Sequence, residues 1–123
     1  MLEMLCLLAQ ERVREQSALG LANTAWAVAV LEIQSEVLMK IIASEARYCA
    51  TQRQLDSQNM TSLAWAFAQL MFHDEPFLTA LISARDTVLS GTPQEMGSFV
   101  WAIAKVSYKE MQAMDDVAKT FID

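Results

Sequence analysis

The three tryptophans of this chain occur in one recurring local pattern, which constrains its fold more than any other feature. Trp26, Trp65 and Trp101 are each followed by Ala, a larger apolar residue and Ala, and each has Asn or Ser three positions earlier. They are 39 and 36 residues apart. Internal similarity at such a period is typical of solenoids built from helical hairpins. The pattern therefore predicts an all-α fold, an α-solenoid of stacked antiparallel helical hairpins with about 36 to 39 residues per repeat.

Each tryptophan segment is followed by a second apolar segment that also repeats. Residues 37–44 align without gaps on residues 76–83. A similar segment at 7–11 precedes the first tryptophan, so we expect the chain to open on the second helix of a repeat. We expect one helical-repeat domain over residues 1–123, a fragment or a short array. Its expected parts are a partial repeat at 1–16 and repeats at about 17–55, 56–91 and 92–123.

Residues that favour helix starts mark the boundaries inside the repeats. Thr92, Pro93 and Glu95 have the arrangement of a capping box with proline at the first helical position, so a helix is expected to begin there. The chain has only 3 Gly and 2 Pro, which argues against a β-sandwich or barrel with many tight turns. About seven helices are expected, over residues 2–15, 18–32, 36–51, 57–71, 75–88, 93–106 and 110–121.

Helix packing accounts for the composition of the tryptophan segments. Alanines allow two helices to approach closely, and one large indole per repeat is expected to fill the space between layers. Stacking of nucleic-acid bases on exposed indoles is the alternative, and we expect it less. The expected repeat core consists of Trp26, Trp65, Trp101, Ala27, Ala66, Ala102, Leu31, Leu70 and Val106.

One segment has a specific resemblance. Residues 21–29 read Leu-Ala-Asn-Thr-Ala-Trp-Ala-Val-Ala, and residues 60–70 and 96–106 are looser copies. This segment resembles the octotricopeptide repeat, a helical-hairpin unit of similar length that is related to the repeats of RAP-domain proteins. Members of that family are mostly organellar RNA-binding factors in transcript maturation, stability and translation, so the resemblance implies a chloroplast or mitochondrial location. Neither the proline-rich entry with a Glu-Trp pair of many family copies nor a RAP-like domain is found in these 123 residues.

Charge and length bear on whether RNA is the partner. With 9 Lys and Arg against 15 Asp and Glu, the net charge is −6, which disfavours a general attraction to nucleic acid or to anionic membranes. An RNA-reading solenoid assigns about one base to each repeat, so three repeats would read about three nucleotides. Hydrogen bonding to the neighbouring helix is the other interpretation of the residues that could contact RNA. These residues are Asn23, Ser62, Ser98, Gln69 and Lys105.

Apolar end layers favour a protein partner. The chain is 54% hydrophobic with eight methionines, and an open array exposes apolar surface that another subunit would cover. We therefore expect a structural or adaptor subunit of a larger, organellar protein assembly, with RNA binding in organellar transcript processing, stability or translation as the alternative. The expected end-layer interface consists of Met1, Met4, Met111 and Met114.

We expect no enzyme activity, cofactor or small-molecule substrate. Cys6, Cys49 and His73 are the only cysteines and histidine, and they do not have the spacing of metal ligands, so no metal site is expected. Both thiols lie in apolar helical segments, in keeping with a reducing compartment. No hydrophobic stretch reaches the roughly 20 residues of a transmembrane helix, so no membrane-spanning segment is expected.

Overall fold

The described part of the chain is helical throughout. The structure, a computed structural model, describes residue 4 and residues 17–122, and for side chains residue 4 and residues 17–107. The helices are α2 (Ala18–Val30), α3 (Glu36–Thr51), α4 (Ser57–Gln69), α5 (Glu75–Ser83), α6 (Arg85–Leu89) and α7 (Pro93–Ile122). This part holds six helices and no strand, so the predicted all-α class is confirmed. The helix expected over 2–15 lies almost wholly outside the described residues, and the one expected over 75–88 consists of α5 and α6.

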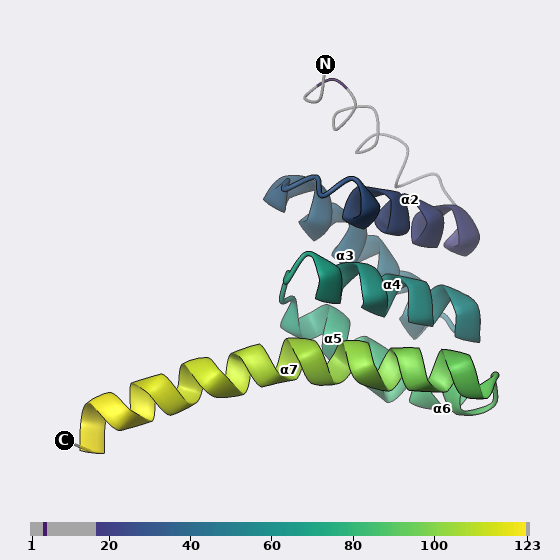
Figure 1. Cartoon of the computed structure of the whole chain (residues 1–123). Coiled ribbons are helices and arrows are strands. Elements are labelled where there is room, and N and C mark those ends of the chain that lie inside the picture. The colour runs from purple at the N-terminus through teal and green to yellow at the C-terminus, as the bar shows by residue number, and fades with distance from the viewer. Residues whose placement is uncertain (1–3, 5–16, 123) are drawn as a thin grey trace.

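The helices are arranged in two rows (Figure 1). In the first row α2 packs beside α4, and α4 packs beside α7. In the second row α3 packs beside α5, and α5 leads into α6. Contacts of α2 with α3, and of α6 with both α4 and α7, join the rows. The middle helix of the first row, α4, therefore has a helix on both of its flanks.

The first-row helices begin in the same way. Ser17, Asp56 and Thr92 precede α2, α4 and α7, and each side-chain oxygen accepts a hydrogen bond from the backbone N–H three residues later, at 3.3, 2.7 and 3.1 Å. These caps are 39 and 36 residues apart, the same spacing as the tryptophans. The capping box predicted at Thr92 is formed, because its backbone N–H donates to Glu95 Oε1 at 2.9 Å.

The α2–α3 and α4–α5 connections are copies of one turn. Glu32 and Met71, 39 residues apart, have left-handed backbone with φ of 54°. In each turn the N–H of the next residue donates to the carbonyl oxygen five residues earlier at 3.0 Å, which is the Schellman arrangement. Ser35 and Asp74 then cap α3 and α5. Arg53, with φ of 59°, ends α3 in the same way.

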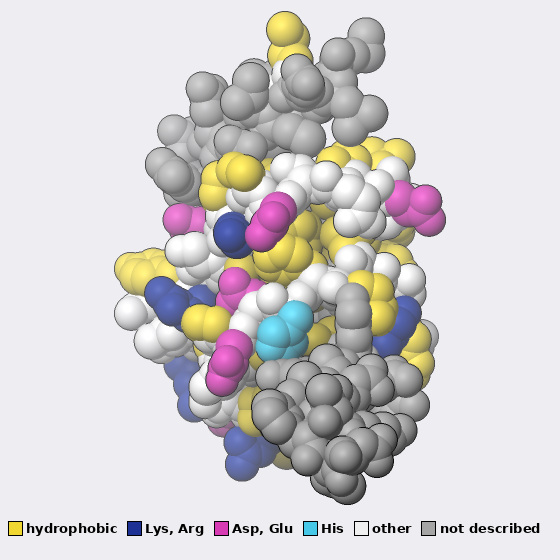
Figure 2. All heavy atoms as spheres, turned by 90° about the vertical axis from the view of Figure 1, so that its left-hand side faces the viewer, with side chains coloured by type: hydrophobic (Ala, Val, Ile, Leu, Met, Phe, Trp, Pro, Cys, Tyr) yellow, Lys and Arg dark blue, Asp and Glu magenta, His cyan; other side chains and the backbone are white. Residues whose placement is uncertain are grey.

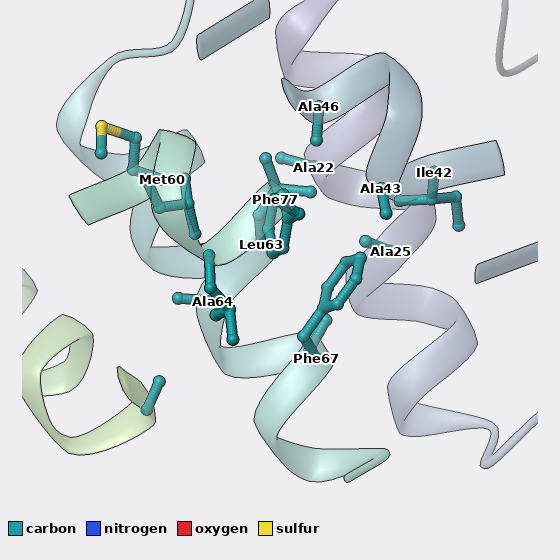
Figure 3. Close-up of a cluster of buried hydrophobic side chains, with 14 of the residues drawn as sticks. Ala22, Ala25, Ile42, Ala43, Ala46, Met60, Leu63, Ala64, Phe67 and Phe77 are labelled. Carbon is teal, nitrogen blue, oxygen red and sulfur yellow. The ribbon is translucent and has the colours of Figure 1, made fainter. Parts of the chain in front are cut away.

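The core lies between the rows and between neighbouring helices of each row. Phe67 of α4 is fully buried and stacks on Phe77 of α5, with ring centroids 4.2 Å apart. Figure 3 shows the Phe67 ring pointing toward Ala25 of α2. Alanines such as Ala25 and Ala64 are buried where first-row helices meet. Short side chains at these contacts let the helix axes approach closely.

The last helix differs from the prediction. A single helix covers residues 93–122, where two helices with a break at 107–109 were expected. Residues 107–109 are Ser-Tyr-Lys and contain neither Gly nor Pro. In addition, Glu110 stands where Ser35 and Asp74 cap the second-row helices, and glutamate is a poor N-cap. Nothing in the local chemistry therefore stops α7 at this point.

Candidate functional site

Burial in the first row depends on the place of a residue relative to the tryptophan. Successive residues of a helix are about 100° apart, so the residues just before and just after the tryptophan lie on opposite flanks. The residue before it is buried Ala25 in α2 and buried Ala64 in α4, but in α7 it is Val100, which is 59% exposed. α2 and α4 are each followed by a first-row helix, whereas α7 is the last described one. We call the side that faces the next helix of the row the forward flank.

The opposite side is the backward flank, which faces the preceding helix of the row. Five residues after the tryptophan, Leu70 and Val106 are buried, whereas Leu31 is 68% exposed. No first-row helix precedes α2 in the described chain, so the expected core position of Leu31 is wrong. The alanines that follow the tryptophans show the same difference. Ala27 of α2 is partly buried, whereas Ala66 of α4 and Ala102 of α7 are fully buried.

Two of the three indoles lie outside the core. Trp26 and Trp101 are 51% and 47% exposed, while Trp65 on the middle helix is partly buried against the core. The expectation that indoles fill the space between layers is therefore wrong for Trp26 and Trp101. The alanine-lined flanks bring the helices too close to admit an indole between them. The side chain that points into the core is instead that of the residue two positions later, which lies about 200° around the helix from the tryptophan. This residue is Val28 in α2 and Phe67 in α4, and both are buried.

The outward side of the first row carries one set of side chains on each helix, and this row lies nearer the viewer in Figure 1. Positions seven and three before the tryptophan, the tryptophan itself and the position four after it lie within about 60° of one another. Each of them is exposed or partly buried. We call these twelve residues the tryptophan face: Leu19, Asn23, Trp26 and Val30 of α2, Gln58, Ser62, Trp65 and Gln69 of α4, and Gln94, Ser98, Trp101 and Lys105 of α7.

The tryptophan face has no carboxylate, although the chain has a net charge of −6. Its one charged group is Lys105, whose Nζ lies 4.9 Å from the centroid of the Trp101 ring, within the range of a cation–π contact. The rest offers apolar rings, aliphatic side chains, amides and hydroxyls. Such a surface can stack on flat groups and exchange hydrogen bonds, but it has few means of attracting anions.

All five residues predicted as contacts lie on this face: Asn23, Ser62, Ser98, Gln69 and Lys105. The residues that were missed lie at the positions seven before each tryptophan and at the position four after the first one. The signal that finds them is helical periodicity, because these positions share the direction of the indole. The four missed residues are Leu19, Gln58, Gln94 and Val30.

A hollow on a second surface lies between the two copies of the hairpin turn. Its volume is about 330 Å³, and its lining includes Ser35 and Glu36 from the first turn and Leu70, Met71 and Phe72 from the second. Figure 2 shows the side of the molecule on which these turns lie, with exposed hydrophobic side chains between charged ones. The hollow is open and is lined by both apolar and polar groups.

Among the residues whose side chains the structure describes, three ionisable groups have shifted pKa values. Burial raises the pKa of the Cys49 thiol, and the nearby Glu45 carboxylate raises it further. A hydrogen bond from Arg53 at 2.9 Å lowers the pKa of Asp86. Hydrogen bonds from a backbone amide and a hydroxyl lower the pKa of Glu95. A raised pKa makes the thiol a poorer nucleophile at neutral pH. The Asp86 hydrogen bond joins α6 to Arg53 just after α3, and Glu95 of α7 accepts a hydrogen bond from Ser57, the first residue of α4.

The expected end-layer methionines are only partly covered by the structure. Met4 is exposed. Met1 lies outside the described residues, as does Cys6. The side chains of Met111 and Met114 also lie outside the described part, although both residues belong to α7.

No group of three or more His, Cys, Asp or Glu residues within the described part is arranged to hold a metal ion. Of the helices formed by residues 17–122, none combines the length and the apolar character needed to cross a membrane. Comparisons of the chain with protein-family models, with curated proteins and with solved structures gave no match.

Proposed function

We propose that this chain is a non-catalytic helical-repeat interaction module that acts as a structural or adaptor subunit of a larger protein assembly. The observation that carries the proposal is the exposed indole of Trp26, which lies on the same face of α2 as the exposed side chains of Leu19 and Val30. Tryptophan is enriched at protein interfaces and among their hot spots, whereas acidic residues are depleted there. The tryptophan face has both properties.

The same proposal includes the stacking of hairpins as an α-solenoid. Caps recur at spacings of 39 and 36 residues, and the left-handed turn of α2 recurs in α4 39 residues later. Among the described helices, α4 in the middle of the first row has a neighbour on both flanks, whereas Leu31 of α2 and Val100 of α7 are exposed. In such an array each unit contacts only its neighbours, so the terminal flanks and the outward side remain for partners.

RNA is the second candidate partner, and the exposed indoles favour it. Base stacking on an aromatic side chain contributes about 1–3 kcal/mol per base. Amide and hydroxyl groups such as those of Asn23 and Ser98 could contact base edges, and the face has no carboxylate to repel phosphates. The resemblance to octotricopeptide repeats and an organellar location fit this candidate. A single cation on the face, Lys105, weighs against it, because phosphate contacts supply much of the affinity for nucleic acid.

The test compares two exposed aromatic residues. Trp26→Ala removes an indole from the tryptophan face, and Tyr48→Ala removes a comparably exposed ring from α3 in the second row. Neither residue is buried, so thermal unfolding should be similar for both variants. We expect a stoichiometric protein complex isolated with the tagged chain to be lost with Trp26→Ala and kept with Tyr48→Ala.

Fluorescence anisotropy with a single-stranded RNA of mixed sequence separates the two candidates. Binding weaker than micromolar is expected if the partner is a protein. Sub-micromolar binding that falls steeply with salt and is lost in Trp26→Ala would establish RNA as the partner. If Trp26→Ala and Tyr48→Ala behave alike in both assays, the tryptophan face is not the binding site.

A further inference from the structure

The second row ends in an uncovered apolar flank. Ile82 of α5 is 41% exposed, whereas the residue aligned with it in α3, Ala43, is 1% exposed. α5 packs beside α3 and follows it in the row, but no described second-row helix follows α5 and α6. Leu89 of α6 is exposed too, and its counterpart 39 residues earlier, Ala50, is buried. The α5–α6 flank, defined by Ile82 and Leu89, is therefore the place where a further second-row helix would pack.

A segment with the sequence of such a helix is present in α7. The residues 12, 13 and 16 positions after the tryptophan are buried in both second-row helices. They are Leu38, Met39 and Ile42 in α3, and Phe77, Leu78 and Leu81 in α5. The same positions after Trp101 are Ala113, Met114 and Val117, which are all apolar. The C-terminal half of α7 thus has apolar residues in the register that a second-row helix requires.

The continuous helix cannot bring this segment to its own α5. α7 has 30 residues without interruption and is about 45 Å long, and Figure 1 shows its C-terminal part extending beyond the other helices. A hairpin would need a left-handed residue and an N-cap, as Met71 and Asp74 provide after α4. The corresponding residues of α7 are Ser107, which does not favour left-handed backbone, and Glu110, which is a poor N-cap. A segment held this way cannot pack on the α5–α6 flank of its own chain.

We propose that residues 107–122 dock on the α5–α6 flank of a second copy of this chain, while the same residues of that copy dock on the α5–α6 flank of the first. An exchange of identical elements gives a closed, two-fold dimer and is a low-cost route to dimerisation. The charge of the segment also fits this occupant. Arg85 is exposed beside Ile82, whose carbonyl oxygen accepts a hydrogen bond from its guanidinium at 2.9 Å, and residues 107–122 carry three acidic residues against two lysines.

Sedimentation velocity over a range of protein concentrations tests the association. We expect a dimer at tens of micromolar, and we expect Ile82→Asp to raise its dissociation constant at least about tenfold, because a charge would be buried against an apolar helix. Val37→Asp is the matched control, since Val37 is an exposed aliphatic residue of α3 outside the α5–α6 flank. A chain that stays monomeric at all concentrations, or a Val37→Asp variant as impaired as Ile82→Asp, would overturn the proposal.

Cross-linking tests the exchange itself. In a Cys6→Ser background, the double variant Ile82→Cys/Val117→Cys should form a covalent dimer on oxidation. An intrachain disulfide in a monomer would show a closed hairpin and overturn the proposal. Ser107→Gly combined with Glu110→Asp supplies the missing turn chemistry and should convert the dimer to a monomer of unchanged helix content. Circular dichroism verifies folding of every variant, and a dimer that persists in the hinge variant also contradicts the exchange.

Discussion

Two leucines at equivalent repeat positions give a direct measure of how burial is distributed. Leu31 and Leu70 both follow their tryptophan by five residues, and both are C-cap residues with φ near −80°. They differ in exposure, 68% against 9%, because only Leu70 has a first-row helix on its backward flank. Replacing each with alanine removes the same atoms from the same backbone conformation, so helix propensity affects both variants equally.

The expected free-energy changes follow from these exposures. Leu→Ala removes three carbons at about 0.8 kcal/mol each when they are fully buried, and a residual cavity adds to the loss. Leu70→Ala should therefore lower the free energy of unfolding by about 2–4 kcal/mol. For Leu31→Ala water fills the vacated space and only about a third of the transfer contribution applies, so the loss should stay below about 1 kcal/mol. The difference of about 2 kcal/mol is a large fraction of the stability of a small domain.

Equilibrium unfolding in urea, followed by far-UV circular dichroism at one protein concentration, measures both variants. With a slope of about 2 kcal/mol per molar urea, the two midpoints should differ by about 1 M. Equal protein concentrations are needed because association would add to apparent stability. If the two variants lose the same free energy, burial in the first row does not depend on a preceding helix, and the assignment of forward and backward flanks is wrong.

Further predictions concern four single sites and are checked by thermal or urea unfolding. Gly91→Ala should destabilise by about 1–3 kcal/mol, because its new Cβ would lie 2.8 Å from Ser57 Cβ, whereas Gly97→Ala in open space on α7 should stabilise by about 1 kcal/mol. Met71→Gly should raise the free energy of unfolding by up to about 1 kcal/mol, because glycine adopts the left-handed backbone at this position without strain. The greater conformational freedom of glycine in the unfolded chain offsets part of this gain. Glu95 has a lowered pKa because the backbone amide of the capping threonine donates to it, so its stabilisation is present above about pH 4.3 and is lost as pH falls through the lower folded pKa. Glu95→Gln should accordingly lose less thermal stability than the unaltered chain between about pH 5 and about pH 3.

Local signals predicted the helix starts well, because a cap depends on residues that are close in sequence. The box at Thr92 and Glu95 is formed as expected, and Asp74 caps α5. The break expected in α7 is missing because the residues at that point provide neither a turn nor a cap. The expected hairpin at 107–109 came from extending the repeat, although these residues carry no turn chemistry of their own.

Burial was less predictable than helix position. An alignment of repeats places Leu31, Leu70 and Val106 on the same flank, but it does not say whether a helix lies beside that flank. The exposed Leu31 and the buried Leu70 therefore could not be distinguished by residue type or by position. The same limit applies to Ile82, whose exposure depends on the absence of a further described second-row helix. Whether a described helix lies beside a flank decides burial at these positions.

The outward direction of the indoles, in contrast, follows from residues already visible in the chain. Alanine on both sides of Trp65 marks both flanks as close helix contacts, which leaves only the inward and outward directions for the indole. The large apolar residue two positions later, Phe67, is about 200° away and takes the inward direction. The indole must then point outward, and a partly covered Trp65 between two half-exposed neighbours is what a row of three helices produces. Small flanks and outward indoles are therefore two results of one packing requirement, and Trp26 and Trp101 on the face they create lie outside the buried core.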